Sequence, residues 1–228
     1  MSEIDLIAQF EPESFIAEAY RKICVTFSTN EGAKQGQVIL FTSVLPGDGT
    51  SATVANMAVT MAKDGQKTLL IDCNFRNPVQ DMIFTRLLGM RQRVGLGDYL
   101  RGMAEPLMEA GGKIENLWVM SNGVTLQNPA RFFSGERMHN LLQQLRHEYD
   151  VILLDLPAVL PVTDAISLLK ETDGVILTVA AGRVSPKVAR VAKERLEKAG
   201  GKILGVILNK VKQSWESGYK DYEYYRRL

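Results

Sequence analysis

The sequence contains little of what several large classes of protein require. Only two cysteines occur in 228 residues, Cys24 and Cys73, and neither has the spacing of a metal-ligand motif. We therefore expect two reduced thiols in a cytoplasmic protein, with no disulfide framework. The two histidines, His139 and His147, fall in one charged stretch, where surface positions are expected.

Long apolar runs and an excess of one charge are also missing. No apolar run is long enough to cross a bilayer, and the acidic start of the chain, with Glu3 and Asp5, does not resemble a signal peptide. The formal net charge is +1, so no overall basic field attracts nucleic acid. We expect no nucleic-acid partner, and membrane association only through another protein.

What is present suits a globular α/β domain. Hydrophobic residues make up 46% of the chain and charged residues 23%, and 228 residues suffice for a full core. Apolar strands alternate with amphipathic helices, which predicts a mostly parallel sheet with helices on both faces. The expected strands are 38–41, 68–72, 117–121, 151–155, 174–180 and 203–209. The expected helices are 12–26, one after Ser51, 81–88, 130–147, one ending at Leu169, and 187–199.

The chain divides into three parts. Residues 1–12 are expected to be a loose N-terminal arm, and residues 13–213 the domain. Residues 28–36 read as a polar loop within it. Residues 214–228 are polar and rich in tyrosine, without a core pattern, and are expected to be a flexible tail.

A strand, a glycine turn and a helix follow one another between Val38 and Ala62, which is the architecture of a phosphate-binding loop. The standard P-loop reads G-x-x-x-x-G-K-[ST]. Gly49 and Ser51 fit it, whereas Val44 stands at the first glycine and Thr50 at the lysine. Thr50 can donate a hydrogen bond but carries no charge. The expected nucleotide-contacting positions are Pro46, Gly47, Asp48, Gly49, Thr50 and Ser51.

Two acids end buried strands, Asp72 and Asp155. Ligands of parallel α/β sheets bind beyond the carboxyl ends of the strands, which is also where the loop lies. Each Asp alone is better explained as a helix-capping or loop residue, but the pair with the glycine turn favours a site for ATP or ADP with Mg²⁺. Ser51 and Asp155 would hold the ion, and Asp72 would be a further metal contact or the catalytic base.

Two further features fall outside this site. Glu18 and Arg21 lie one turn apart on a helix and read as a weak exposed pair. Several tyrosines of the tail are accessible candidates for phosphorylation, although a segment that docks on a partner, or one without a role, is equally compatible with the local sequence. These tyrosines are Tyr219, Tyr222, Tyr224 and Tyr225.

Together these residues resemble the bacterial tyrosine kinases (BY-kinases) of capsule and exopolysaccharide assembly, relatives of the MinD/ParA P-loop ATPases. The resemblance runs from about Glu13 to the end of the chain. It is carried by Ala-Glu-Ala-Tyr-Arg at 17–21, the loop at 43–51, Leu-Ile-Asp with Arg76 and Pro78 at 70–78, the segment 149–165, and Leu-Gly-Val-x-Leu-Asn at 204–209.

The resemblance implies a three-layer P-loop NTPase fold that binds ATP or ADP with Mg²⁺, with Arg76 among the retained nucleotide-site residues. It implies a cytoplasmic protein at the inner face of the plasma membrane, held there by the cytoplasmic segment of a chain-length-determinant (Wzz-like) membrane protein. It also implies rings formed through the helix of Glu18 and Arg21, and phosphorylation of the tyrosine tail between subunits.

Three departures from the family pattern fall on charged positions. Thr50 replaces the loop lysine, Asn74 replaces a second aspartate, and Cys24 replaces a second arginine of the ring-contact helix. We therefore expect a scaffold-like regulator of exopolysaccharide polymerisation and export with weak or lost kinase activity, working alone or beside an active BY-kinase. The alternative is an active autokinase that recruits its missing charge from Arg76 or a neighbouring subunit. A MinD/ParA-like positioning ATPase is disfavoured, because the tail shows no amphipathic membrane-targeting helix.

Overall fold

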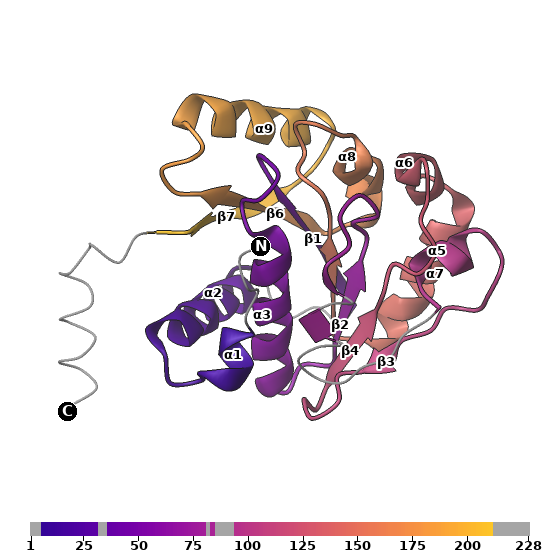
Figure 1. Cartoon of the computed structure of the whole chain (residues 1–228), viewed down its shortest axis with the longest axis horizontal. Helices are drawn as coiled ribbons and strands as arrows, with labels where there is room; N and C mark the ends of the chain where they lie inside the picture. The colour runs from indigo at the N-terminus through magenta and orange to yellow at the C-terminus, as the bar shows by residue number, and fades with distance from the viewer. Residues whose placement is uncertain (1–5, 32–35, 81–82, 85–93, 212–228) are drawn as a thin grey trace.

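The computed structural model of the chain describes residues 6–31, 36–80, 83–84 and 94–211. A seven-stranded sheet lies at its centre in the order β3-β4-β2-β5-β1-β6-β7 (Figure 1). Every neighbouring pair is parallel except β3 with β4. The strands are β1 Gln37–Ser43, β2 Thr68–Asp72, β3 Glu109–Ala110, β4 Leu117–Met120, β5 Val151–Asp155, β6 Gly174–Ala180 and β7 Ile203–Asn209. This confirms the predicted sheet. The strand β3 was not predicted, because two residues are too few to show a strand pattern in the sequence.

Helices cover both faces of the sheet and make it a three-layer fold, as predicted. One face carries α1 Ile7–Phe10, α2 Phe15–Glu31 and α3 Thr50–Lys63. The other carries α5 Leu96–Leu100, α6 Pro129–Phe133, α7 Glu136–Glu148, α8 Asp164–Leu168 with the 3₁₀ turn Leu169–Glu171, and α9 Pro186–Lys198. No helix in these described ranges is long and apolar enough to span a membrane.

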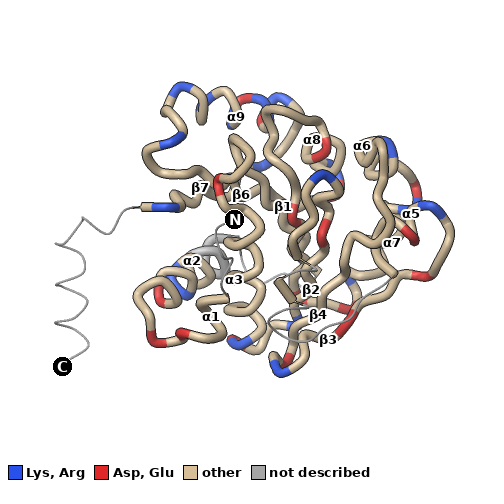
Figure 2. The backbone as a smooth tube through the Cα atoms, viewed as in Figure 1, with Lys and Arg blue, Asp and Glu red and all other residues tan. Residues whose placement is uncertain are grey.

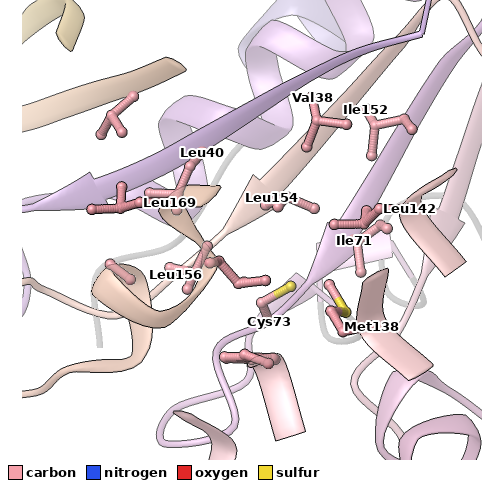
Figure 3. Close-up of a cluster of buried hydrophobic side chains, with 14 of the residues drawn as sticks. Val38, Leu40, Ile71, Cys73, Met138, Leu142, Ile152, Leu154, Leu156 and Leu169 are labelled. Atoms are coloured by element: carbon pink, nitrogen blue, oxygen red, sulfur yellow. The ribbon is translucent and has the colours of Figure 1, made fainter. Parts of the chain in front are cut away.

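The central strands are buried on both faces, which explains their unbroken apolar runs. Alternate side chains of one strand enter different cores, so that Val38 and Leu40 pack beneath α7 while Ile39 and Phe41 pack beneath α3. Figure 3 shows the first of these cores, in which Met138 of α7 lies near Ile71 and Cys73. The carboxyl ends of strands β1, β2 and β5 are thereby fixed between two packed layers.

The N-terminal arm was predicted to be loose, and this is wrong for its described part. Leu6 is fully buried, and Ala8 is held at both of its backbone groups. The Ala8 N–H donates to Asn56 Oδ1 at 2.9 Å, and Lys63 Nζ donates to the Ala8 carbonyl at 2.8 Å. A four-residue helix is too short to show a periodic pattern, so its docking on α3 has no local signal.

Two helix predictions also need correction. The expected helix 130–147 is divided into α6 and α7 at Gly135, because the chain there is extended (φ −89°, ψ 159°). The first long helix begins at Phe15 and continues to Glu31, so residues 28–31 of the expected loop 28–36 are helical, and residues 32–35 lie outside the described residues. Most of the expected helix 81–88, and the tail with its tyrosines, lie outside the described residues.

Candidate nucleotide and magnesium site

The carboxyl ends of three adjacent strands bring the predicted acids and the glycine loop together. Asp72 and Asp155 are register partners on β2 and β5, and Asp155 also pairs with Phe41 of β1. The loop leaves β1 immediately beyond this point and enters α3 at Thr50. The parallel arrangement of the sheet is the reason, since it places all three ends at one edge.

The loop is shaped by two glycines with left-handed backbones, Gly47 (φ 82°) and Gly49 (φ 97°). Its interior is held by Asp48, whose Oδ2 accepts a hydrogen bond from the Leu45 N–H at 2.9 Å. Its exterior is held by Asn209 at the end of β7, whose Nδ2 donates to the Asp48 carbonyl at 3.0 Å. The conformation of the loop is therefore set before any ligand binds.

Alanine at Gly49 is expected to deform this loop. The added Cβ would lie 2.1 Å from Asn209 Nδ2, and the left-handed backbone adds strain of its own. We expect the free energy of unfolding to fall by about 1–3 kcal/mol. Urea unfolding followed by circular dichroism measures this, with Gly65→Ala as the control, because Gly65 also has a positive φ but an added Cβ there meets nothing within 4 Å. Equal losses for the two variants would show that the Asn209 contact is unimportant.

Asp155 is buried completely and keeps one oxygen without a hydrogen-bond partner in the described part of the chain. Its Oδ2 accepts from Gln80 Nε2 at 2.7 Å. Burial raises the pKa of Asp155 from its ordinary value of 3.8 to about 6, and hydrogen bonds from the Ser51 and Gln80 side chains oppose this rise. A buried carboxylate with spare acceptor capacity is suited to a bound cation.

Asp72 is also fully buried, and backbone groups orient it. Its Oδ1 accepts from the Asn74 N–H at 2.9 Å, and its Oδ2 accepts from the Gln80 N–H at 3.2 Å. Asn74, which stands at the second acidic position of the family pattern, uses its own Oδ1 to accept from the Asn77 N–H at 3.2 Å. Its side chain therefore shapes the turn after β2.

The residues present fit a magnesium ion that shares its ligands with a nucleotide. Asp155 Oδ1 and Thr50 Oγ1 are buried oxygens that lack partners among the described residues. Over the same ranges, no group of three His, Cys, Asp or Glu could hold a metal by itself. Mg²⁺ commonly takes one or two carboxylates and completes its shell with phosphates and water. Ser51 and Asp155, with Asp72 beside them, match that requirement.

Two cations reach the loop that the sequence did not suggest. Lys210 Nζ donates to the Gly47 carbonyl at 2.7 Å, and Arg183 approaches Asp48 Oδ1 at 3.7 Å. Figure 2 shows Lys and Arg positions, in blue, close to the end of the described chain after β7. Lys210 thus contacts the loop at a backbone carbonyl, and Arg183 contacts it at a carboxylate. The sequence feature that could have predicted the contact of Lys210 is the pair Asn209-Lys210 directly after an apolar strand.

Arg76 lies beside the end of β2 but is engaged elsewhere. Its Nε and one terminal nitrogen donate to the two oxygens of Asp164 at 2.8 and 3.0 Å. Asp164 is fully buried at the start of α8, and its hydrogen bonds raise the pKa of Arg76 above the ordinary value. This bidentate pair ties the turn after β2 to α8.

The predicted oligomer-contact residues form a pair within α2. Arg21 donates to Glu18 Oε2 at 2.7 Å and to the Pro12 carbonyl at 2.9 Å. Both side chains are partly exposed, so the pair contributes little to stability by itself. The contact was expected; its part in assembly remains a prediction.

Comparisons with known proteins show the family to which the chain belongs. A sequence model of the ParA family, described as NUBPL iron-transfer P-loop NTPase, matches residues 34–226. The tyrosine-protein kinase YwqD of Bacillus subtilis is 34% identical over 220 residues, covering 96% of this chain and 91% of YwqD. The chain belongs to the bacterial tyrosine kinase family of P-loop NTPases. The resemblance drawn from the motifs is thereby confirmed.

Two other similar proteins are informative. The crystal structure of the chimerical protein CapA2B2 superposes with a TM-score of 0.84 at 31% identity, covering 91% of this chain and 90% of the other. The succinoglycan biosynthesis transport protein ExoP of Rhizobium meliloti is 29% identical over 218 residues, which are 93% of this chain but 27% of ExoP. The same domain thus occurs both as most of a protein and as part of a longer one.

Proposed function

We propose that this BY-kinase family member regulates exopolysaccharide polymerisation and export, with tyrosine kinase activity that is weak or lost. The observation that carries the proposal is the position of Thr50. It begins α3 behind the glycine loop, is 7% exposed, and offers an uncharged hydroxyl where the family has lysine. Lys210, Arg183 and Arg76 are each engaged with other protein groups, as described above.

The chemistry expected of the site follows from its residues. The backbone N–H groups of the loop and the start of α3 would face the phosphates, and Ser51 and Asp155 would hold Mg²⁺, which supplies charge neutralisation when bound. Asp72 would orient a ligand of the ion or accept the proton of the attacking hydroxyl. Phosphoryl transfer depends on charge stabilisation, and the loss of one stabilising donor typically costs about 2.7–4 kcal/mol at the transition state. The groups that bind the nucleotide and the ion are therefore kept, while the stabilisation of the transition state is reduced.

The proposed partner is the cytoplasmic segment of a chain-length-determinant (Wzz-like) membrane protein, which would keep the domain at the inner face of the plasma membrane. The match to one part of ExoP, a transport protein, supports this. We further propose that copies of the chain, or this chain and an active BY-kinase, contact one another through α2. Phe15, Ile16 and Val25 are exposed apolar residues on that helix, next to Glu18 and Arg21.

Removal of the gene from its host is expected to change the chain length of the secreted polysaccharide, which size-exclusion chromatography measures. The natural chain should restore the length, and an Asp155→Asn chain should restore it as well, because a scaffold does not need phosphoryl transfer. Unchanged polysaccharide in the deletion strain would contradict the regulatory role. Restoration by the natural chain alone would instead favour an active kinase.

The second candidate is an active autokinase that phosphorylates Tyr219, Tyr222, Tyr224 and Tyr225. The presence of Lys210 and Arg183 at the loop favours it, since either long side chain carries the charge that Thr50 lacks. Mass spectrometry of the purified chain after incubation with Mg²⁺ and ATP distinguishes the candidates. Phosphotyrosine that forms in the natural chain but not in Asp155→Asn would establish the second.

A further inference from the structure

Gln80 connects all three elements of the site, although nothing in the sequence marked it. It is fully buried, and its backbone N–H donates to Asp72. Its side-chain Nε2 donates both to Asp155 Oδ2 at 2.7 Å and to the Ser51 carbonyl at 3.1 Å. One amide group therefore joins β5 to the first turn of α3, while the backbone of the same residue is tied to β2.

The orientation of this amide is dictated by its donors. Gln80 Oε1 is buried and has no hydrogen-bond partner among the described residues. An unsatisfied buried oxygen is unfavourable, so the two N–H bonds must outweigh it. The reverse orientation would place the amide oxygen against a carboxylate oxygen and a carbonyl, which are all acceptors. The side chain thus presents partial positive charge to Asp155.

A bound Mg²⁺ would present full positive charge to the same carboxylate. We propose that Gln80, which donates to Asp155 Oδ2, draws negative charge from the carboxylate whose other oxygen, Oδ1, is left for the cation, and that it thereby lowers the affinity of the site for Mg²⁺. This inference rests on the proposed magnesium–nucleotide site and assigns a positioning role to a residue outside the motifs. Because the amide is neutral, it holds the carboxylate in place and takes up only part of its charge, whereas lysine or arginine would form an ion pair there.

The competition has a measurable size. A cation that shares a carboxylate with a hydrogen-bond donor binds more weakly, by up to the equilibrium factor of that hydrogen bond. A hydrogen bond to a charged group corresponds to about a tenfold factor or somewhat more. Gln80→Ala is therefore expected to bind the cation about tenfold more tightly than its parent. A residue that served as a ligand would give the opposite sign.

The test is a titration with Mn²⁺ in the presence of ADP, followed by the electron paramagnetic resonance signal of free Mn²⁺. It is performed in the natural chain and in Thr50→Lys, each with and without Gln80→Ala. Gln80→Leu serves as a second variant that fills the space without donating. Gln144→Ala is the matched control, since Gln144 Nε2 also donates to a carboxylate, Glu148, but on the exposed surface of α7.

Tighter binding by about tenfold in both Gln80 variants, with no change in Gln144→Ala, supports the proposal. Equal or weaker binding in the Gln80 variants overturns it and leaves the proposed function intact. If no chain binds Mn²⁺ with ADP, including Thr50→Lys, the proposed magnesium–nucleotide site and this inference both fail.

The natural chain provides an independent readout. The side-chain NH₂ protons of Gln80 should be protected from exchange with water in the cation-free chain, because both are hydrogen-bonded donors in a buried site. Addition of Mg²⁺ and ADP should shift their ¹H–¹⁵N signals and reduce the protection. Signals that stay unchanged at saturating cation would refute the competition for the charge of Asp155.

Discussion

Lysine at position 50 is expected to restore phosphoryl transfer to the chain. Thr50 Oγ1 is buried without a hydrogen-bond partner in the described ranges, and the residue lies at the first turn of α3, directly behind Gly49. An ammonium group on a flexible stem there would face the phosphates of a nucleotide held by the loop. Using the typical value of one stabilising donor, we expect tail phosphorylation to accelerate by about 10²–10³-fold.

Calorimetry with Mg²⁺ and ATP, together with mass spectrometry of the tail, measures this effect. Thr50→Lys should bind the nucleotide clearly more tightly than the natural chain, while Thr50→Ser, which keeps the hydroxyl and adds no charge, should behave like the natural chain. Micromolar binding and rapid tail phosphorylation by the natural chain would contradict the expectation. Lys210→Met would then show whether the cation at Gly47 supplies the charge.

Asparagine at position 155 is expected to stabilise the fold while it abolishes cation binding. The pKa of Asp155 is raised from 3.8 to about 6, chiefly by burial. Between these values the folded chain holds a proton that the unfolded chain has released, so the free energy of unfolding decreases as the pH rises from about 4 to 6. The full cost at neutral pH is about 3 kcal/mol. Asparagine carries no charge and avoids this cost, but it has one acceptor oxygen fewer. We therefore expect Asp155→Asn to raise the free energy of unfolding at neutral pH by about 2 kcal/mol.

Urea unfolding at pH 4 and at pH 7.5 tests the sign as well as the size. The advantage of Asp155→Asn should be small at pH 4, where the natural carboxyl is protonated, and should reach its full value above pH 6. Cation binding by the natural chain should strengthen over the same interval, because the ion requires the carboxylate. A variant that is less stable than the natural chain at pH 7.5 would show that the hydrogen bonds of Asp155 outweigh its burial.

The meeting of Asp72 and Asp155 at the glycine loop was predictable because it depends on strand direction alone. Each acid ends an apolar run, the runs alternate with helices, and the carboxyl ends of parallel strands share one edge of the sheet. The glycine turn and the helix after Ser51 add the third component at that edge. No side-chain contact was needed for the argument, so the fold and the place of the site followed from pattern.

The partners of the side chains at this edge followed only from tertiary structure. Arg76 was a candidate source of charge for the nucleotide, yet it is paired with Asp164, which is 88 positions away. Lys210 reaches Gly47 across 163 positions, and Gln80 reaches Asp155 across 75. The sequence by itself determined which residues are strands, which ends carry acids, and that Thr50 lacks a charge. The periodicity of a chain reports which face a side chain occupies, but the group it meets there is decided by the packing of remote elements, and only the folded structure contains that information.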